Sequence, residues 1–583
     1  MFAKPLIYRL NRWHKTGTSE RIGVCQMCQV TRLIGGAGTG KTHAILTAMT
    51  DAREELGLRP EEIGFTTFTR NGQQVMASRA AEAWGIAESF LTRHGHFRTT
   101  HSTALRLTGI SRDQLLTNDR ACIQWIAERL GTSLGADGDD DDESEMFHPL
   151  DRESEMAALA INAWHMSRNR LVPYAAVLDE ALAQGVSVPE LESARAMVEK
   201  YEAAKRADDR LDYADLLGRF VGISFHVDGH LEIAPQGDVP EELRMLCLDE
   251  AQDASALIDL TCRRLANGPN VERVLIVGDN FQSIFGFNGG SAEHFMSWKA
   301  SQSVMPMSFR CPRPIMDFGE DCLRQMHEGY WDRGIQPASH DGSIEQAGGA
   351  QAAIVTFVDS DKTALVLARC LFTLPRYEKL LDERAIPFSR LDRPDAAARR
   401  GCLALWNLEH DLTVQQEDFA EAVEMLPVKN AEVGNLLDKG AKAAWSRGDF
   451  TSYDLIRRSD LTQLGCTPAA VAMISRGEWP EAMTPKHRRL ARRWVDSAKE
   501  YGPDLATSPR VKLSTIHAAK GAEADLVILS TESSRKVHLN SSRLPQLHDE
   551  ECRVAYVAVT RARERLVIVE DSGPYRLALP RAF

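Results

Sequence analysis

Short apolar runs alternate along this chain with longer stretches in which apolar residues recur at helical spacing. Apolar runs of strand length are typical of strands buried on both faces of a sheet, and their alternation with helices indicates parallel α/β sheets. We expect strands at residues 30–34, 63–68, 245–248, 274–277, 513–515, 525–530 and 566–569.

Two long stretches lack these apolar runs, and in them Ala, Leu, Glu and Arg recur with helical period. We interpret both as mostly helical subdomains inserted into α/β cores. The sequence therefore predicts a first core formed by 1–104 and 211–303 around the insertion 105–210, and a second core formed by 304–391 and 508–583 around the insertion 392–507.

The composition permits several packed cores, because 43% of the 583 residues are hydrophobic. At about 150 residues per domain this length corresponds to about four domains. No apolar run approaches the ~18 residues that span a bilayer, and the first residues lack a signal-peptide pattern. The 11 cysteines form no disulfide framework, so we expect a reducing cytoplasmic setting. Cys25 and Cys28 have metal-ligand spacing, but no second Cys/His pair lies near them, and we favour two buried thiols.

The charge distribution limits how the chain can bind nucleic acid. The formal net charge of −13 argues against a general basic surface, so binding would depend on local Lys and Arg placement and on base stacking. The acidic run 137–145 lacks the spacing of a calcium loop, and we expect a solvated insertion there.

The strongest chemical signal is a glycine-rich loop between the first predicted strand and a helical pattern. Backbone N–H groups of such a loop bind phosphates, the helix N-terminus favours their charge, Lys41 reaches the β and γ oxygens, and Thr42 offers a hydroxyl to Mg²⁺. The sequence therefore predicts a nucleoside triphosphate site at Gly35, Gly36, Ala37, Gly38, Thr39, Gly40, Lys41 and Thr42.

Two adjacent carboxylates follow the predicted strand 245–248. Asp249 is suited to hold Mg²⁺, directly or through water, and Glu250 to orient or deprotonate the water that attacks the γ-phosphate. Together with the glycine loop, this pair predicts hydrolysis of the bound triphosphate.

A series of motifs resembles the superfamily 1A helicases of the UvrD/PcrA/Rep type. All occur in the family's order and lie in both predicted cores. They are residues 35–42, Thr67-Phe68-Thr69, Thr100-His101-Ser102, 249–253, 277–287, Phe309-Arg310, 515–523 and 556–562.

The resemblance implies two RecA-like P-loop cores, 1A and 2A, each with a mostly helical inserted subdomain, 1B and 2B. It implies that Arg310 and Arg561 act as arginine fingers from the second core, that Gln282 contacts the γ-phosphate, and that Glu523 holds the ribose. ATP would then lie between the cores and draw them together.

The resemblance also assigns a strand-binding surface. Phe68, Phe285 and Phe287 match positions of aromatic residues, whose rings stack on bases of any sequence, although phenylalanines more often fill a core. His101, Thr515 and His517 match contacts to the phosphate backbone, and for lone histidines a structural role is the alternative.

Some positions depart from the family pattern. No Asn-x-x-Gln element that would read the adenine edge precedes the glycine loop, and Gln26 or Gln29 would have to replace it. Phe287 and Asn288 stand where the family carries tryptophan and arginine, which predicts a weaker grip on the strand.

The function implied is an ATP- and Mg²⁺-dependent DNA helicase or translocase. It would move 3′ to 5′ on single-stranded DNA, unwind duplex at single-strand/double-strand junctions, and serve DNA repair, replication or recombination as a monomer or weak oligomer without a membrane. Alternatives are a translocase that strips proteins from DNA, a helicase–nuclease motor that needs a partner, and a nucleotide-gated DNA-binding switch. RNA remains an alternative substrate, because stacking does not inspect the 2′-OH.

Overall fold

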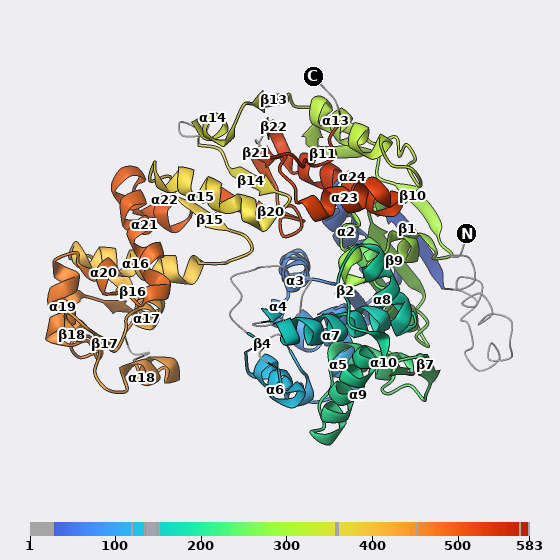
Figure 1. The fold of residues 1–583 in the computed structure, drawn as a ribbon, viewed down its shortest axis with the longest axis horizontal. Helices are drawn as coiled ribbons and strands as arrows, with labels where there is room; N and C mark the ends of the chain where they lie inside the picture. The colour runs from blue at the N-terminus through green and yellow to red at the C-terminus, as the bar shows by residue number, and fades with distance from the viewer. Residues whose placement is uncertain are drawn as a thin grey trace. The chain divides into compact units, whose positions relative to one another are not determined.

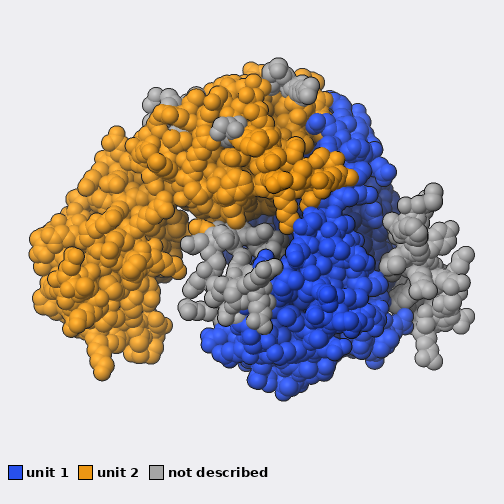
Figure 2. Space-filling model, in the orientation of Figure 1, with its two compact units in different colours: residues 1–310, 323–339, 544–556 blue, residues 311–322, 340–543, 557–583 orange. Residues whose placement is uncertain are grey.

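A computed structural model describes residues 28–117, 120–132, 134–135, 148–149, 152–355, 361–450, 453–570 and 573–580. Cys25, Gln26 and the acidic run 137–145 lie outside the described residues. Contacts divide the chain into two units (Figure 2): unit 1 comprises 1–310, 323–339 and 544–556, and unit 2 comprises 311–322, 340–543 and 557–583.

Unit 1 contains a six-stranded parallel sheet (Figure 1). Residues of β8 (Met245–Leu248) and β9 (Arg273–Gly278) alternate between two apolar clusters, one on each face of the sheet. The other strands are β1 (Gln29–Ile34), β2 (Ile63–Thr67), β3 (His96–Thr99) and β10 (Ser301–Val304), in the order β10-β1-β9-β8-β2-β3. Helices α2 (Lys41–Leu56), α3 (Arg70–Trp84), α4 (Glu88–Arg93), α5 (Thr100–Thr108), α11 (Ala256–Ala266) and α12 (Ala292–Met296) accompany the sheet.

A helical part of unit 1 packs around the buried side chains of Trp164, Tyr174 and Tyr201. It comprises α6 (Arg120–Leu130), α7 (Arg152–Arg170), α8 (Tyr174–Ala183) and α9 (Leu191–Ala207), followed by α10 (Tyr213–Val221) and the hairpin β6 (Ile223–His226) and β7 (Gly229–Glu232).

Unit 2 contains a second six-stranded parallel sheet, in the order β13-β22-β21-β14-β20-β15. Its strands are β13 (Ser343–Ala347), β14 (Ala364–Ala368), β15 (Phe388–Arg390), β20 (Val511–Thr515), β21 (Ala524–Ser530) and β22 (Ala562–Val569). The helices near these strands in the chain are α13 (Arg313–Arg324), α14 (Ala350–Val355), α15 (Leu374–Asp382) and α23 (Arg535–Arg543). Helix α24 (Pro545–Val559) follows α23, and its residues up to Tyr556 belong to unit 1.

A second apolar core lies in the helical part of unit 2 and includes the buried Trp479 and Trp494. Its helices are α16 (Ala396–Glu409), α17 (Gln416–Met425), α18 (Ala441–Arg447), α19 (Pro468–Ser475), α20 (Trp479–Ala482), α21 (Pro485–Tyr501) and α22 (Pro503–Thr507).

The predicted fold class is confirmed, because both sheets are parallel and all seven expected strands are present. The four domain ranges stay a prediction; of the predicted second core, the division by contacts counts 304–310, 323–339 and 544–556 with unit 1. Among the described residues, no helix is both long and apolar enough to cross a membrane.

Candidate functional site

The predicted phosphate loop connects β1 to α2 in unit 1. Gly38 and Gly40 have positive φ angles of 68° and 83°, which favour glycine. A Cβ on Gly38 would lie 2.2 Å from the Cβ of Arg310, so the loop also needs glycine for close approach. The Lys41 ammonium donates to the carbonyl oxygen of Gly35 at 3.0 Å, which folds the lysine back along the loop. The residues 35–42 therefore form one continuous cradle.

Strand β11 (Met307–Pro312) lies directly against this loop. The Phe309 N–H donates to the Gly38 carbonyl at 2.8 Å, and the Ser308 hydroxyl donates to the Ala37 carbonyl at 2.8 Å. These bonds hold Arg310 beside the loop, and Arg310 belongs to unit 1.

The Phe309 ring was not assigned a role from the sequence. It is 71% exposed, and it lies 3.7 Å from where a Cβ on Gly40 would be. An exposed aromatic face is thus available next to the phosphate cradle. In the sequence, only the position of Phe309 directly before Arg310 pointed to this ring, because the exposure of a side chain can be seen only in the fold.

The two predicted acidic residues lie at the C-terminal end of β8. Asp249 is buried, and its carboxylate accepts the Glu250 N–H at 2.9 Å. Glu250 has φ 53° and ψ 33°, a left-handed conformation that costs a non-glycine residue about 1 kcal/mol and that clusters at functional sites. Gln252 donates to the Glu250 carboxylate at 2.5 Å, which fixes the side chain.

A hydrogen-bond network extends from this acidic pair to Gln282. The Gln252 side-chain oxygen accepts the Asp279 N–H at 3.0 Å, and the Gln282 amide donates to the Asp279 carboxylate at 2.8 Å. Gln252, Asp279 and Gln282 are all buried. The predicted γ-phosphate contact Gln282 is therefore linked to Glu250 through two residues.

Arg333 completes the network and was missed in the sequence. Its guanidinium donates to Asp279 at 2.7 Å and to the Tyr556 hydroxyl at 3.1 Å, and it lies 4.6 Å from the centroid of the Phe281 ring. The Tyr556 hydroxyl also accepts the N–H of Ala37 at 3.3 Å. Both arginine and tyrosine are buried, so the network reaches the phosphate loop itself.

The donors that would hold Mg²⁺ are compatible with that ion. Thr42 lies in the first turn of α2, and Asp249 follows β8. A hydroxyl and a carboxylate are oxygen ligands of the type that Mg²⁺ takes.

The strand-binding candidates of unit 1 are half-buried. Phe285 and Phe287 contact each other edge to face, with ring centroids 5.8 Å apart, while Phe68 follows β2. His101 packs against Tyr213 at 5.0 Å, and burial lowers the pKa of His101 to about 4. His101 is therefore neutral at physiological pH, and any contact it makes to a phosphate is a hydrogen bond without charge.

The candidates of unit 2 lie around β20 and β21. Thr515 ends β20, and its hydroxyl accepts the Ala518 N–H at 3.3 Å. Burial, with Arg369 and Lys520 nearby, lowers the pKa of His517 to about 3. Glu523 makes an ion pair with Arg563 at 2.8 Å.

Arg561 is buried in unit 2 at the beginning of β22. Its guanidinium donates to the carbonyl oxygens of Val557 at 2.9 Å and Ala522 at 3.3 Å. Only five positions separate it from Tyr556, which lies in the last turn of α24, whereas Arg561 comes two positions after that helix ends.

The phosphate loop connects a strand of a parallel sheet to the helix that follows it, and an acidic pair lies at the end of another strand of that sheet. This arrangement defines a P-loop nucleotide-binding protein. Two family models match the chain: the UvrD/REP helicase N-terminal domain over residues 17–302 and the UvrD-like helicase C-terminal domain over residues 497–572. The chain therefore belongs to the UvrD-like helicases of superfamily 1.

Curated relatives agree with this family. YjcD of Bacillus subtilis, named as a candidate ATP-dependent DNA helicase, is 23% identical over 51% of this chain and 37% of its own length. The ATP-dependent DNA helicase Srs2 of Schizosaccharomyces pombe is 24% identical over 52% of this chain and 34% of its own length. A probable DNA helicase II homologue of Rickettsia felis is 24% identical over 49% of this chain and 41% of its own length. The matches thus span about two fifths or less of each relative.

Proposed function

We propose that this chain is an ATP-driven motor that moves on single-stranded DNA, 3′ to 5′, and unwinds duplex DNA at junctions in repair, replication or recombination. The contacts of the phosphate loop with Ser308 and Tyr556 carry the proposal. Ser308 directly precedes the family motif Phe309-Arg310, and Tyr556 begins the motif 556–562, so we propose that a change at the loop is passed on to both motifs.

In the proposed hydrolysis, Lys41 and Arg310 neutralise charge on the transferring phosphoryl group from the loop side. Arg561 supplies a second positive charge when the two cores close. Glu250 takes the proton of the attacking water. Gln282 contacts the γ-phosphate and, through its hydrogen bond to Asp279, links that phosphate to the buried network around Asp279. Thr42 and Asp249 would hold Mg²⁺, which would neutralise charge on the bound phosphates.

We propose that Phe309 stacks on the nucleobase. Its exposed ring beside Gly40 supports this, since a flat apolar face binds any base without reading its edge. Glu523 would hold the ribose through a carboxylate that now pairs with Arg563. The site would therefore accept several nucleoside triphosphates, because stacking does not distinguish one base from another.

For the DNA track we propose stacking on Phe68, Phe285 and Phe287, with backbone contacts from His101, Thr515 and His517. The edge-to-face pair of Phe285 and Phe287 supports this role, because its rings are only half-buried. We also propose a reducing cytoplasmic setting, because the 11 cysteines of the sequence form no disulfide framework.

The decisive experiment measures ATPase rate with and without single-stranded DNA, together with unwinding of duplexes tailed at either end. We expect DNA to stimulate hydrolysis and only 3′-tailed duplexes to open. Lys41→Ala and Glu250→Gln should abolish hydrolysis and spare DNA binding. His43→Ala, on the exposed face of α2, should leave both hydrolysis and DNA binding unchanged. DNA-stimulated turnover in either site variant would contradict the proposal.

A strand-end translocation assay tests the alternatives. A nucleotide-gated switch hydrolyses ATP without reaching a labelled end. A translocase that strips proteins reaches the end and displaces a bound protein but opens no duplex.

A further inference from the structure

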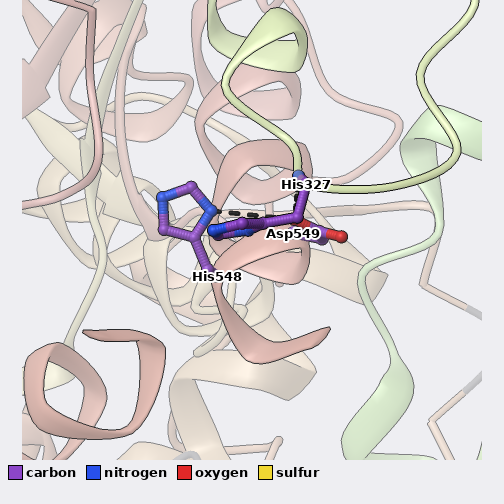
Figure 3. Close-up of side chains that lie close together, drawn as sticks. All are labelled: His327, His548 and Asp549. Carbon is purple, nitrogen blue, oxygen red and sulfur yellow. Dashed lines mark hydrogen bonds and ion pairs between the residues drawn. The ribbon is translucent and has the colours of Figure 1, made fainter. Parts of the chain in front are cut away.

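A cluster of metal-ligand side chains lies in unit 1, away from the phosphate loop residues themselves. Helix α24 carries His548 and Asp549, and the segment after α13 carries His327 (Figure 3). One ligand atom from each of these three lies within 4.8 Å of the others. Among the described residues, this is the one such group that contains histidine.

The separations match those around a tetrahedral ion. Nitrogen and oxygen ligands bound at 2.0–2.1 Å to zinc lie roughly 3.4 Å apart along the edge of the tetrahedron. In the structure, the Asp549 Oδ1 lies 3.1 Å from the His327 Nδ1 and 3.7 Å from the His548 Nδ1. The centroids of the two imidazole rings are 4.6 Å apart and their planes meet at 76°, so the rings lie edge to face and do not stack.

A sulfur atom lies next to His548, although it falls outside the group of three whose ligand atoms all lie within 4.8 Å of one another. Cys552 lies one helical turn after His548, and its Sγ is 3.5 Å from the His548 Nδ1. Nitrogen and sulfur ligands of a tetrahedral zinc lie roughly 3.5 Å apart, given Zn–S and Zn–N distances of about 2.3 and 2.05 Å. A set of two imidazoles, a carboxylate and a thiolate favours zinc over magnesium or calcium.

The Asp549 carboxylate is also oriented by hydrogen bonds from backbone N–H groups, as metal-binding carboxylates typically are by their neighbours. The backbone N–H of His327 donates to Asp549 at 2.7 Å, and that of Glu328 donates to it at 3.2 Å. Asp549 is nearly buried, whereas the His327 side chain is 51% exposed and leaves an entry path for an ion.

A second group of metal-ligand side chains in unit 1 consists of carboxylates alone and differs from the histidine cluster. Glu202, Asp212 and Asp215 also lie within ligand distance of one another. The buried ammonium of Lys205 contacts all three carboxylates at 2.6–2.8 Å, and Arg168 pairs with Asp212 at 2.7 Å. Each of those three carboxylates already contacts a cation, so among the described residues we take the histidine cluster as the metal candidate.

We propose that His327, His548 and Asp549 form a structural zinc site that fastens the segment after α13 to α24, with Cys552 brought in as the fourth ligand by rotation of its side chain. The inference goes beyond the proposed motor, because it assigns no step of hydrolysis to the metal. Its consequence is mechanical: α24 also carries Tyr556 to the phosphate loop, so the metal would stabilise the helix that holds this contact.

The test uses the full chain, first stripped with a chelator and then titrated with Zn²⁺ against a chromophoric indicator. We expect one ion per chain and affinity at least 10-fold weaker in His327→Ala, whose half-exposed side chain can be removed with little effect on folding. His230→Ala, on the exposed strand β7 of the same unit, is the matched control. Absence of tight binding to the wild-type chain, or equal affinity in His327→Ala, would overturn the site.

Cobalt substitution tests the sulfur ligand separately. The Co²⁺ form should show the visible bands of a tetrahedral ion and a thiolate charge-transfer band. The charge-transfer band should vanish in Cys552→Ser, while circular dichroism confirms that this variant is folded. Persistence of the band in Cys552→Ser would overturn the assignment of the fourth ligand.

Discussion

The hydroxyl of Tyr556 accepts a hydrogen bond from the backbone N–H of Ala37, although 519 positions separate the two residues in sequence. The contact brings the last family motif onto the first one. Since Arg333 donates to the same hydroxyl and to Asp279, one chain of hydrogen bonds connects the phosphate loop to Asp279 and, through Gln252, to Glu250.

Tyr556→Phe removes this hydroxyl and keeps the buried ring. A typical hydrogen bond contributes 0.5–1.5 kcal/mol, so we expect the kcat/KM for ATP to fall about 5-fold as the loop loses its anchor. Steady-state ATPase kinetics measure the change. Tyr453→Phe removes an exposed hydroxyl that donates to Gln463, and it should leave kcat/KM unchanged. Equal kinetics in the two variants would show that the anchor has no role.

Arg333→Met should destabilise the chain, because it leaves the fully buried carboxylate of Asp279 without its cation. Loss of one partner of a buried pair typically costs about 3–5 kcal/mol. The double variant Arg333→Met/Asp279→Asn removes both charges and should recover much of this loss. Urea unfolding followed by circular dichroism measures both variants, and an additive loss in the double variant would refute the pairing.

Phe309→Ala should raise the KM for ATP about 10-fold or more with little effect on kcat, because stacking on a base contributes about 1–3 kcal/mol. Titration with a fluorescent nucleotide measures the affinity. Phe372→Ala removes a ring of unit 2 that is 58% exposed and serves as the control. The same titration with GTP should give an affinity within several-fold of that for ATP; strict preference for ATP would indicate an edge-reading residue.

The sequence predicted the parts of the fold that are locally encoded. Central strands such as β8 and β9 are buried on both faces, so their apolar runs are unambiguous. The edge strands β3 and β10 carry polar residues and gave no such signal, whereas β14 is an apolar run that was overlooked. The glycine loop was likewise readable, because its residues are consecutive.

The connections of the site could not be predicted in this way. Arg333 lies in a segment without regular structure, and its partner Asp279 is 54 positions away. No local pattern distinguishes an arginine that will be buried against a carboxylate from one that stays in solvent. The left-handed backbone of Glu250 was equally hidden, since nothing in the residue type favours it.

Phe287→Ala should lower unwinding more than it lowers ATPase activity. The ring is half-buried against Phe285 and stands where the family carries a larger aromatic, so its loss weakens strand grip without touching the nucleotide. Parallel assays of unwinding and DNA-stimulated hydrolysis measure the ratio. Equal losses in both would mean that the ring only supports the fold.

Acidification should destabilise the chain through its packed histidines. Free histidine titrates near pH 6.5, whereas His101 in the folded state has a pKa of about 4, so the unfolded chain binds the proton first. The stabilisation is present above pH 6.5 and falls as pH decreases toward 4, by at most about 1.4 kcal/mol per pH unit. His165 and His517, with pKa values of about 3, act in the same direction. Urea midpoints at pH 7.5, 6 and 5 should therefore decrease, and more gently in His101→Asn, which cannot take up the proton, than in the exposed control His230→Asn. Parallel curves for the two variants would show that folding leaves the pKa of His101 at its ordinary value, which would permit an ionic contact to DNA once the imidazole is protonated.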